Sequence, residues 1–252
     1  MNLCYIDELL WHLNWTGDLE YATKIWPVLT SSLAWEKRNY DPDNDGLYDA
    51  YCCIWASDAL YYNSGAVTHS SAYNYRANKM AAEIAAKIGQ DPKPYSQEAE
   101  KILKALNARL WISGKGHWAE YQDFMGEKKV HESAAVWTIY HAIDSEVHDA
   151  CQGYKATRYL DTEIPHIPVV GKGLKDEGYA TISTSNWLPY SWSINNVVFA
   201  EVAHTALSYW QVGRNEEGFK LLKSDLLDEM FLGGSPGNFG QISYLDKARS
   251  EA

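Results

Sequence analysis

Apolar residues recur at helical spacing along much of the chain, in two distinct patterns. In the first pattern a single apolar stripe runs along an otherwise polar segment, as at positions 99, 102, 103, 106 and 110 of the segment 97–110. Residues 18–38 and 216–231 repeat this pattern. Such a stripe is typical of a helix that buries one face and exposes the other. We therefore predict three half-exposed helices, with a kink at Pro27.

The second pattern is apolar on nearly all sides, which predicts helices that other elements cover. Residues 70–88, 133–144 and 196–211 show it, and a narrow polar stripe containing Glu201 and His204 interrupts the last of them. The two patterns alternate along the chain, so we expect an inner and an outer layer of helices. This alternation predicts an all-α fold of about eight helices, paired as about four hairpins, in a single domain over residues 1–252.

The links between the predicted helices have unequal lengths. Links from an inner to an outer helix are short, as at 89–93 and 212–215, whereas links from an outer to an inner helix are long: 39–69, 112–132 and 161–195. Long ordered connections in a compact domain commonly carry function. In a two-layer arrangement all the long links fall at one end, where we expect a cleft.

Composition excludes several classes of partner. The formal charge is −11 and the sequence has no basic run, which argues against binding to nucleic acid or an anionic membrane. No apolar stretch approaches the roughly 20 residues of a membrane span, and "MNLCYIDELLWHLNW" lacks the features of a signal peptide. The cysteines show no metal or disulfide spacing, so we expect buried thiols. They are Cys4, Cys52, Cys53 and Cys151.

The aromatic content is dominated by rings that carry a polar group. The chain has 11 Trp and 18 Tyr but only 5 Phe. Such rings suit core packing and also stacking on sugar faces.

Three stretches, taken with the helical pairs, resemble a known family. They are "LNWTGD" (13–18), "WEKRNYDPDNDGLYDAY" (35–51) and "GHWAEYQD" (116–123). The chain resembles the six-hairpin glycosidases, whose (α/α)6 toroid has its active site in the funnel formed by the long loops. "WTGD" followed by an outer helix is similar to the corresponding stretch of α-L-rhamnosidases.

Four further stretches are similar to one bacterial branch of that family. They are "IWASDAL", "HSSAYNYRANKMA", "NWLPYSWSINNVVFAE" and "GSPGNFGQISYLDKAR". This branch degrades polysaccharides and is associated with β-L-arabinofuranosidases acting on plant pectin. The resemblance implies a periplasmic or extracellular glycosidase whose partner is an oligosaccharide or polysaccharide.

The resemblance departs from the family in the number of hairpins, because we count about four where the family has six. We therefore expect an incomplete toroid that is inactive or weakly active alone. Self-association or additional flanking domains are expected to cover its open flanks.

Glycoside hydrolysis requires two carboxyl groups about 5–10 Å apart, one to protonate the leaving oxygen and one to activate water or attack carbon. Glu120 and Asp58 lead as catalytic residues, because each lies in a long link near tryptophans. Alternation through residues 117–122 predicts a short strand that places Glu120 on the same face as Trp118. Glu132, Asp123 and Glu36 are further candidates. Glu120 can instead be a hydrogen-bonded structural carboxylate, and Glu132 can simply favour a helix dipole.

Aromatic, amide and other polar side chains near the same links are candidates for substrate binding. For any single Trp the alternative is core packing, and for Asp18 and Asn195 the alternative is a helix N-cap. The candidates are Trp15, Asp18, Trp55, His69, Tyr73, Asn74, Trp118, Trp187, Tyr190, Trp192, Asn195 and Asn196.

No zinc pattern occurs, and we predict no cofactor. "DPDNDG" (41–46) matches the opening of a calcium loop, with Asp41, Asp43 and Asp45 as ligands. The glutamate expected at the twelfth position is Cys52. We therefore favour a tight acidic turn over a calcium site.

Two other classes of function remain open. Sugar epimerases use the same toroid with histidine pairs as acid and base, and His69, His117, His131 and His204 are available for that role. A non-catalytic carbohydrate-binding protein is the third alternative.

Overall fold

The computed structural model describes residues 2–50, 65–188, 195–233, 243 and 245. These residues form eight α-helices, and α8 continues into a π-helix, η2. The helices are α1 (Asn2–Thr16), α2 (Leu19–Tyr40), α3 (Thr68–Lys87), α4 (Lys93–Arg109), α5 (Val136–Asp144), α6 (Ala150–Glu163), α7 (Phe199–Gln211), α8 (Asn215–Leu226) and η2 (Leu227–Leu232). No helix among the described residues is long and apolar enough to cross a membrane.

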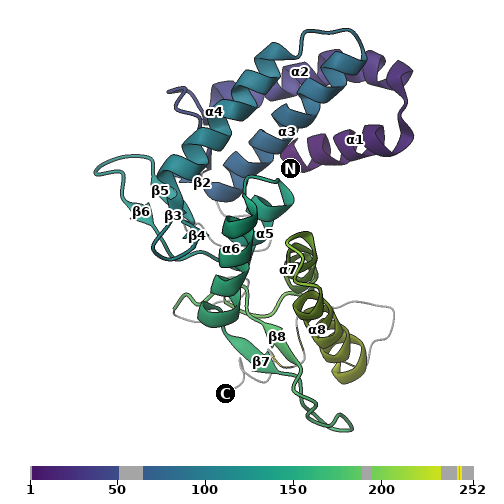
Figure 1. Ribbon diagram of the computed structural model, residues 1–252, viewed down its shortest axis with the longest axis vertical. Helices are drawn as coiled ribbons and strands as arrows, with labels where there is room; N and C mark the ends of the chain where they lie inside the picture. The colour runs from purple at the N-terminus through teal and green to yellow at the C-terminus, as the bar shows by residue number, and fades with distance from the viewer. Residues whose placement is uncertain (1, 51–64, 189–194, 234–242, 244, 246–252) are drawn as a thin grey trace.

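The helices form two layers, as the alternating patterns predicted. The odd-numbered helices pack side by side in chain order, α1 on α3, α3 on α5 and α5 on α7. Each pairs with the even-numbered helix that follows it, most extensively in the hairpins α3–α4 and α7–α8. Figure 1 shows α1–α2 and α3–α4 at the top and α7–α8 at the bottom, with α5 and α6 between them. The prediction of an all-α fold built from helical hairpins is confirmed.

The inner helices bury nearly all of their surface. Every residue of α5 from Val136 to Ile143 is buried, and α3 buries positions on several sides. The outer helix α4 buries one stripe, which contains Ala99, Ile102, Ala105 and Leu106. Burial of apolar surface is the main force that holds the two layers together.

A polar network crosses the inner layer. The Arg76 guanidinium of α3 pairs with Asp7 of α1 at 2.9 Å and with Asp144 at the end of α5. Asp144 also accepts a hydrogen bond from Gln211 Nε2 of α7 at 2.7 Å. The network therefore joins all four inner helices.

Short strands lie in the long links. A four-stranded antiparallel sheet has the order β1-β2-β5-β6, whereas β3 pairs with β4 and β7 with β8. The strands are β1 (Asp49–Ala50), β2 (Gly65–Val67), β3 (Trp111–Ile112), β4 (His117–Trp118), β5 (Tyr121–Asp123), β6 (Val130–His131), β7 (His166–Pro168) and β8 (Ala180–Ile182). The first sheet joins the first and second long links.

Gly65 allows β2 to approach β5 closely. Its φ is +153°, and a Cβ there would lie 2.0 Å from the carbonyl oxygen of Gln122. Only glycine avoids this clash.

Two helix starts and the cysteine expectation need correction. α5 begins at Val136 rather than 133. α7 begins at Phe199 rather than 196, because Asn196 pairs through its backbone with Thr184 (N···O 2.7 Å) instead of entering the helix. Cys4 and Cys151 are exposed rather than buried. Cys52 and Cys53 lie outside the described residues.

The exposed face of α1 generates a prediction about assembly. α1 leaves Tyr5, Trp11 and Trp15 exposed, and Trp15 retains 83% of its accessible surface. Because monomers rarely expose large apolar patches, we expect self-association at micromolar concentration with a roughly doubled mass in light scattering. Trp15→Glu should return the mass toward that of a monomer.

The matched control is Met125→Glu on the β5–β6 hairpin, since Met125 is also highly exposed. This variant should associate as the wild type does. A monodisperse wild-type monomer would show that the exposed residues of α1 do not drive self-association.

Candidate functional site

The long links meet at the N-terminal ends of the inner helices. Thr68 Oγ1, at the start of α3, donates to the Ala119 carbonyl at 2.6 Å. The Val136 N–H, at the start of α5, donates to the Thr184 carbonyl at 2.9 Å. We call this end of the fold the mouth, and define it as residues 65–69, 118–121, 132–138, 183–187 and 195–198. The predicted convergence of the long links is therefore present in the described parts of all three.

Glu120 lies between β4 and β5 and is only 1% exposed. Its Oε1 accepts from Trp137 Nε1 at 2.7 Å, and its Oε2 accepts from Thr138 Oγ1 and lies 3.4 Å from the Ala135 nitrogen. The first N–H groups of a helix have no partners inside the helix and carry partial positive charge. Glu120 therefore supplies a carboxylate to the start of α5 from a distant link.

The other predicted carboxylates have separate partners. Glu132 is exposed and pairs with Lys115 at 2.7 Å, so the hydrogen bond and charge of Lys115 lower the Glu132 pKa. Asp123 pairs with His131 Nε2 at 2.7 Å. Glu36 is buried within α2. Asp58 lies outside the described residues.

The sequence placed Trp118 and Glu120 on one face of a strand, and the structure corrects this. β4 ends at Trp118 and β5 begins at Tyr121, in a different sheet. The Trp118 side chain is fully buried, with its ring 4.7 Å from that of Trp111. Trp118 is therefore a core residue and does not face a sugar.

The remaining aromatic candidates are scattered. Trp187 is half-buried at the mouth, where its Nε1 donates to the Ser133 carbonyl at 3.1 Å and its ring meets Trp137 edge to face. Trp15 lies on the exposed surface of α1. Trp55, Tyr190 and Trp192 lie outside the described residues.

Two polar candidates are engaged within their own helices. Asp18 is the N-cap of α2 and accepts from Tyr21 N at 2.8 Å. Asn74 donates to the Ser70 carbonyl at 3.0 Å inside α3. Neither arrangement brings the side chain to the mouth.

Asn195 and Asn196 lie at the mouth and are buried. Asn195 does not cap α7, because the N-cap is Val198; its amide donates to the Trp187 carbonyl instead. In the described part of the chain, neither amide atom of Asn196 has a hydrogen-bond partner.

The structure also assembles a polar cluster within the inner layer. The ring of His141 lies 5.8 Å from that of His69, 4.7 Å from Tyr73 and 5.7 Å from His204. Tyr140 stacks on His204 at 4.0 Å. The sequence analysis named His69, Tyr73 and His204 but missed His141 and Tyr140, whose signal was polarity within an otherwise apolar helix.

Glu201 joins this cluster from α7 and was likewise missed as a site residue. Tyr140 Oη donates to its Oε2 at 2.6 Å, while its Oε1 has no hydrogen-bond partner among the described residues. Burial raises the pKa of Glu201 to about 7. Burial also lowers the pKa of His69 to about 3 and lowers that of His141. The inner layer thus holds neutral histidines beside a carboxyl group that titrates near neutrality.

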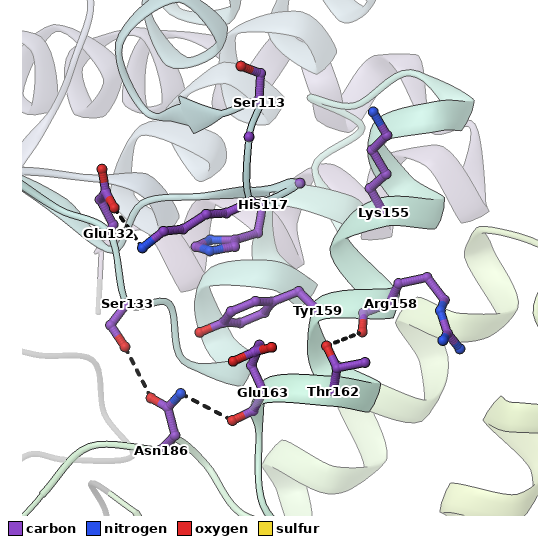
Figure 2. A pocket seen from close by; sticks show the side chains of 13 residues that line it. Ser113, His117, Glu132, Ser133, Lys155, Arg158, Tyr159, Thr162, Glu163 and Asn186 are labelled. Atoms are coloured by element: carbon purple, nitrogen blue, oxygen red, sulfur yellow. Dashed lines mark hydrogen bonds and ion pairs between the residues drawn. The ribbon is translucent and has the colours of Figure 1, made fainter.

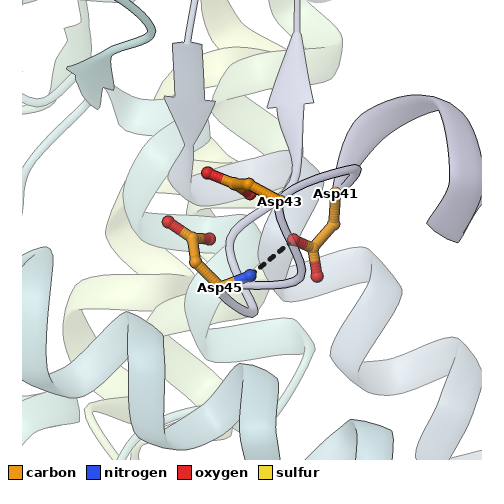
Figure 3. Close-up of side chains that lie close together, drawn as sticks. All are labelled: Asp41, Asp43 and Asp45. Atoms are coloured by element: carbon orange, nitrogen blue, oxygen red, sulfur yellow. Dashed lines mark hydrogen bonds between the residues drawn. The ribbon is translucent and has the colours of Figure 1, made fainter.

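Asp41, Asp43 and Asp45 form a compact acidic turn (Figure 3) with carboxylate oxygens within 4.8 Å of one another. Asp41 accepts from the N–H groups of Asp45 at 2.8 Å and Gly46 at 3.2 Å, and it also pairs with Lys37. Asp45 accepts from Leu47 N at 2.9 Å and pairs with Arg109. These bonds involve both carboxylate oxygens of Asp41 and both of Asp45.

No family model matches the sequence, and no curated protein is significantly similar to it. Solved structures share its fold. The GH63 mannosylglycerate hydrolase from Thermus thermophilus in complex with glucose matches with a TM-score of 0.67 at 12% identity, over 95% of this chain and 68% of that chain. The GH78 rhamnosidase of Bacillus sp. GL1 matches with a TM-score of 0.62 at 16% identity, over 89% of this chain.

The rhamnosidase from Klebsiella oxytoca with rhamnose bound matches with a TM-score of 0.60 at 16% identity, over 88% of this chain. This chain spans only 20% of the Bacillus enzyme and 36% of the Klebsiella enzyme. These neighbours are members of the (α/α)6 toroid glycosidase superfamily. At such identities the likeness establishes the fold, and the resemblance to the toroid is confirmed at that level.

The raised pKa of Glu201 generates a prediction about stability. Folding favours its protonated form, so its contribution is fully present below the unfolded pKa of 4.5 and is lost as the pH rises to about 7. Glu201→Gln keeps the acceptor for Tyr140 and removes the titration. The variant should match the wild type at pH 4 and exceed its free energy of unfolding by up to about 3 kcal/mol at pH 8. Urea unfolding at both pH values measures this.

Glu83→Gln, on the exposed surface of α3, is the matched control and should show no such pH-dependent gain. Equal behaviour of the two variants would remove Glu201 as the titrating group.

The acidic turn generates a second prediction. Asp41→Asn should lower the free energy of unfolding by about 1–3 kcal/mol, because it weakens the acceptor for two backbone N–H groups and Lys37. The loss should be the same in millimolar calcium and in EDTA. A rise in the wild-type melting temperature with calcium would instead establish a calcium site.

Proposed function

We propose that this chain is the toroid portion of a glycoside hydrolase that acts on a plant-type or related polysaccharide, with substrate bound at the mouth. The observation that carries the proposal is the convergence of the long links at the start of α5, in a fold shared with GH63 and GH78 hydrolases. Trp187 supports it, because the bond from its indole N–H to Ser133 holds the half-buried ring at the mouth, where an aromatic face can stack on a sugar.

Burial divides the candidate carboxylates into two roles. Glu120 is buried and bonded to three donors, so we assign it to positioning the first turn of α5. Asp58 is assigned to proton transfer on its sequence position alone. Solvent reaches the carboxylates of Glu132 and of the half-buried Asp123, so these two are the candidates for the second group of the pair.

Activity on arabinan and rhamnogalacturonan oligosaccharides, measured as released reducing sugar, tests the proposal. Asp58→Asn should lower turnover by roughly 10²–10⁴ without changing the melting temperature. Wild-type turnover in this variant would exclude Asp58. Binding without turnover of any glycan would instead support a non-catalytic carbohydrate-binding protein.

Glu120→Gln separates positioning from catalysis. The NH₂ group of the new glutamine side chain would face the donors that now bond to the Glu120 carboxylate. The free energy of unfolding should therefore fall by about 1–3 kcal/mol. Turnover per folded molecule should change much less than in Asp58→Asn. Glu132→Gln, an exposed neighbour, is the control for stability and should melt like the wild type. An unchanged melting point for Glu120→Gln, with turnover lost, would return Glu120 to the catalytic candidates.

The histidine cluster favours sugar epimerisation as a second candidate. His69, His141 and His204 lie together, as an acid–base pair would require, whereas His117 and His131 lie elsewhere. Burial keeps His69 and His141 neutral, so neither is a ready acid, and this function ranks second. Incubation with free sugars in heavy water distinguishes the two, because an epimerase exchanges a carbon-bound proton.

A further inference from the structure

A cavity of about 740 Å³ lies beside the mouth, between α6 and the turn that joins β3 to β4 (Figure 2). Its size falls within the range of about 300–1,000 Å³ that is typical of small-molecule sites. Its floor is formed by His117 and Tyr159, which are both buried and whose rings lie 3.9 Å apart. Three residues of its lining, Glu132, Ser133 and Asn186, also belong to the mouth.

The floor of the cavity offers hydrogen-bond acceptors. His117 Nδ1 lies 2.8 Å from the Trp118 carbonyl, which can only accept, so Nδ1 carries the proton. Burial lowers the pKa of His117, so the ring is neutral and Nε2 keeps its lone pair. Tyr159 Oη donates to the Ala134 carbonyl at 2.8 Å and can still accept.

The cations around the cavity are neutralised or directed away. Lys115 pairs with Glu132 at 2.7 Å, and Arg158 pairs with Asp161 at 2.8 Å. Lys155 also lines the cavity, and Figure 2 shows its amino group pointing away from the His117 and Tyr159 rings, as the Arg158 guanidinium does. The lining also includes the carboxylate of Glu163. An anionic ligand would meet mainly acceptors here, whereas hydroxyl groups supply the donors that these acceptors need.

The rim is held in place before any ligand arrives. Ser133 Oγ donates to Asn186 Oδ1 at 3.0 Å, and Asn186 Nδ2 donates to the Glu163 carbonyl at 3.1 Å. These bonds tie the end of α6 to the second and third long links. A preorganised rim lowers the entropy cost of binding.

We propose that this cavity is a second carbohydrate site, which adjoins the mouth and binds a neutral saccharide unit through its hydroxyl groups. The hydroxyls donate to His117 Nε2, Tyr159 Oη and the Glu163 carboxylate, and the ring lies against the aromatic floor. The site does not depend on the hydrolase function, since a non-catalytic carbohydrate-binding protein would use it equally. In a hydrolase it holds a neighbouring part of the polysaccharide close to the mouth.

Titration calorimetry with neutral arabino-oligosaccharides tests this site, with inorganic phosphate and galacturonate as anionic probes. Ser113→Trp places a bulky ring in the cavity from an exposed position, and Glu163→Ala removes one acceptor. We expect Ser113→Trp to weaken binding of the neutral sugar by at least about tenfold, and Glu163→Ala to weaken it by a smaller factor. Neither anionic probe should compete.

Glu83→Ala on α3 removes an exposed carboxylate outside the cavity lining and should bind like the wild type. Circular dichroism checks that each variant folds. If Ser113→Trp does not fold, the sugar affinity of Glu163→Ala tests the cavity. Unchanged sugar affinity in the folded cavity variants, or displacement of the sugar by phosphate, would overturn the proposal. If the wild-type chain binds sugar at this cavity but turns over no glycan, the result would count against the hydrolase function only.

Discussion

The buried guanidinium of Arg76 sets the relative position of the inner helices. It lies on α3 and pairs with Asp7 of α1 and Asp144 of α5, while His204 and Gln211 of α7 approach the same Asp144 carboxylate. Apolar packing is non-directional, so it leaves the axial register of these helices loosely specified. A buried charge must be paired, and removal of one partner typically costs about 3–5 kcal/mol. Burial raises the pKa of Asp7 to about 6, whereas for Asp144 the effect of burial is outweighed by His204 and Arg76, which lower its pKa.

The same constraint fixes α5, the shortest of the inner helices. Asp144 is its last residue and is held by Arg76, and Glu120 bonds to its first turn at Trp137 and Thr138. Two carboxylates, one from the helix itself and one from a distant link, therefore determine where α5 begins and ends. Because the second and third long links attach to the start of α5, the position of the mouth follows from the register of the inner layer.

Periodicity in the sequence was sufficient to predict the two layers, the hairpins and the end at which the long links meet. It could not predict contacts between links, because these depend on partners far apart in the chain. The backbone pairing of Thr184 with Asn196 delays the start of α7 in this way, and no local pattern signals it. Alternation placed Trp118 and Glu120 on one face of a single strand. In the structure β4 ends at Trp118, and the next strand, β5, begins after Glu120 in a different sheet. The polar stripe on α7 was visible in the sequence, but its meeting with His141 required the packing of α5 against α7.

Ser133 lies on the boundary between the mouth and the cavity beside α6, and it contributes to both. Its carbonyl accepts from the Trp187 indole at the mouth, and its hydroxyl donates to Asn186 at the rim of the cavity. Residues 186 and 187 are adjacent in the third long link, so a ligand on either side would restrain the same short segment. Ordering a segment once lowers the entropy cost of a second binding event that needs the same order. A polysaccharide that reached both sites would therefore bind more tightly, because both sites order the same segment. Binding at one site would strengthen binding at the other without any movement of the helices.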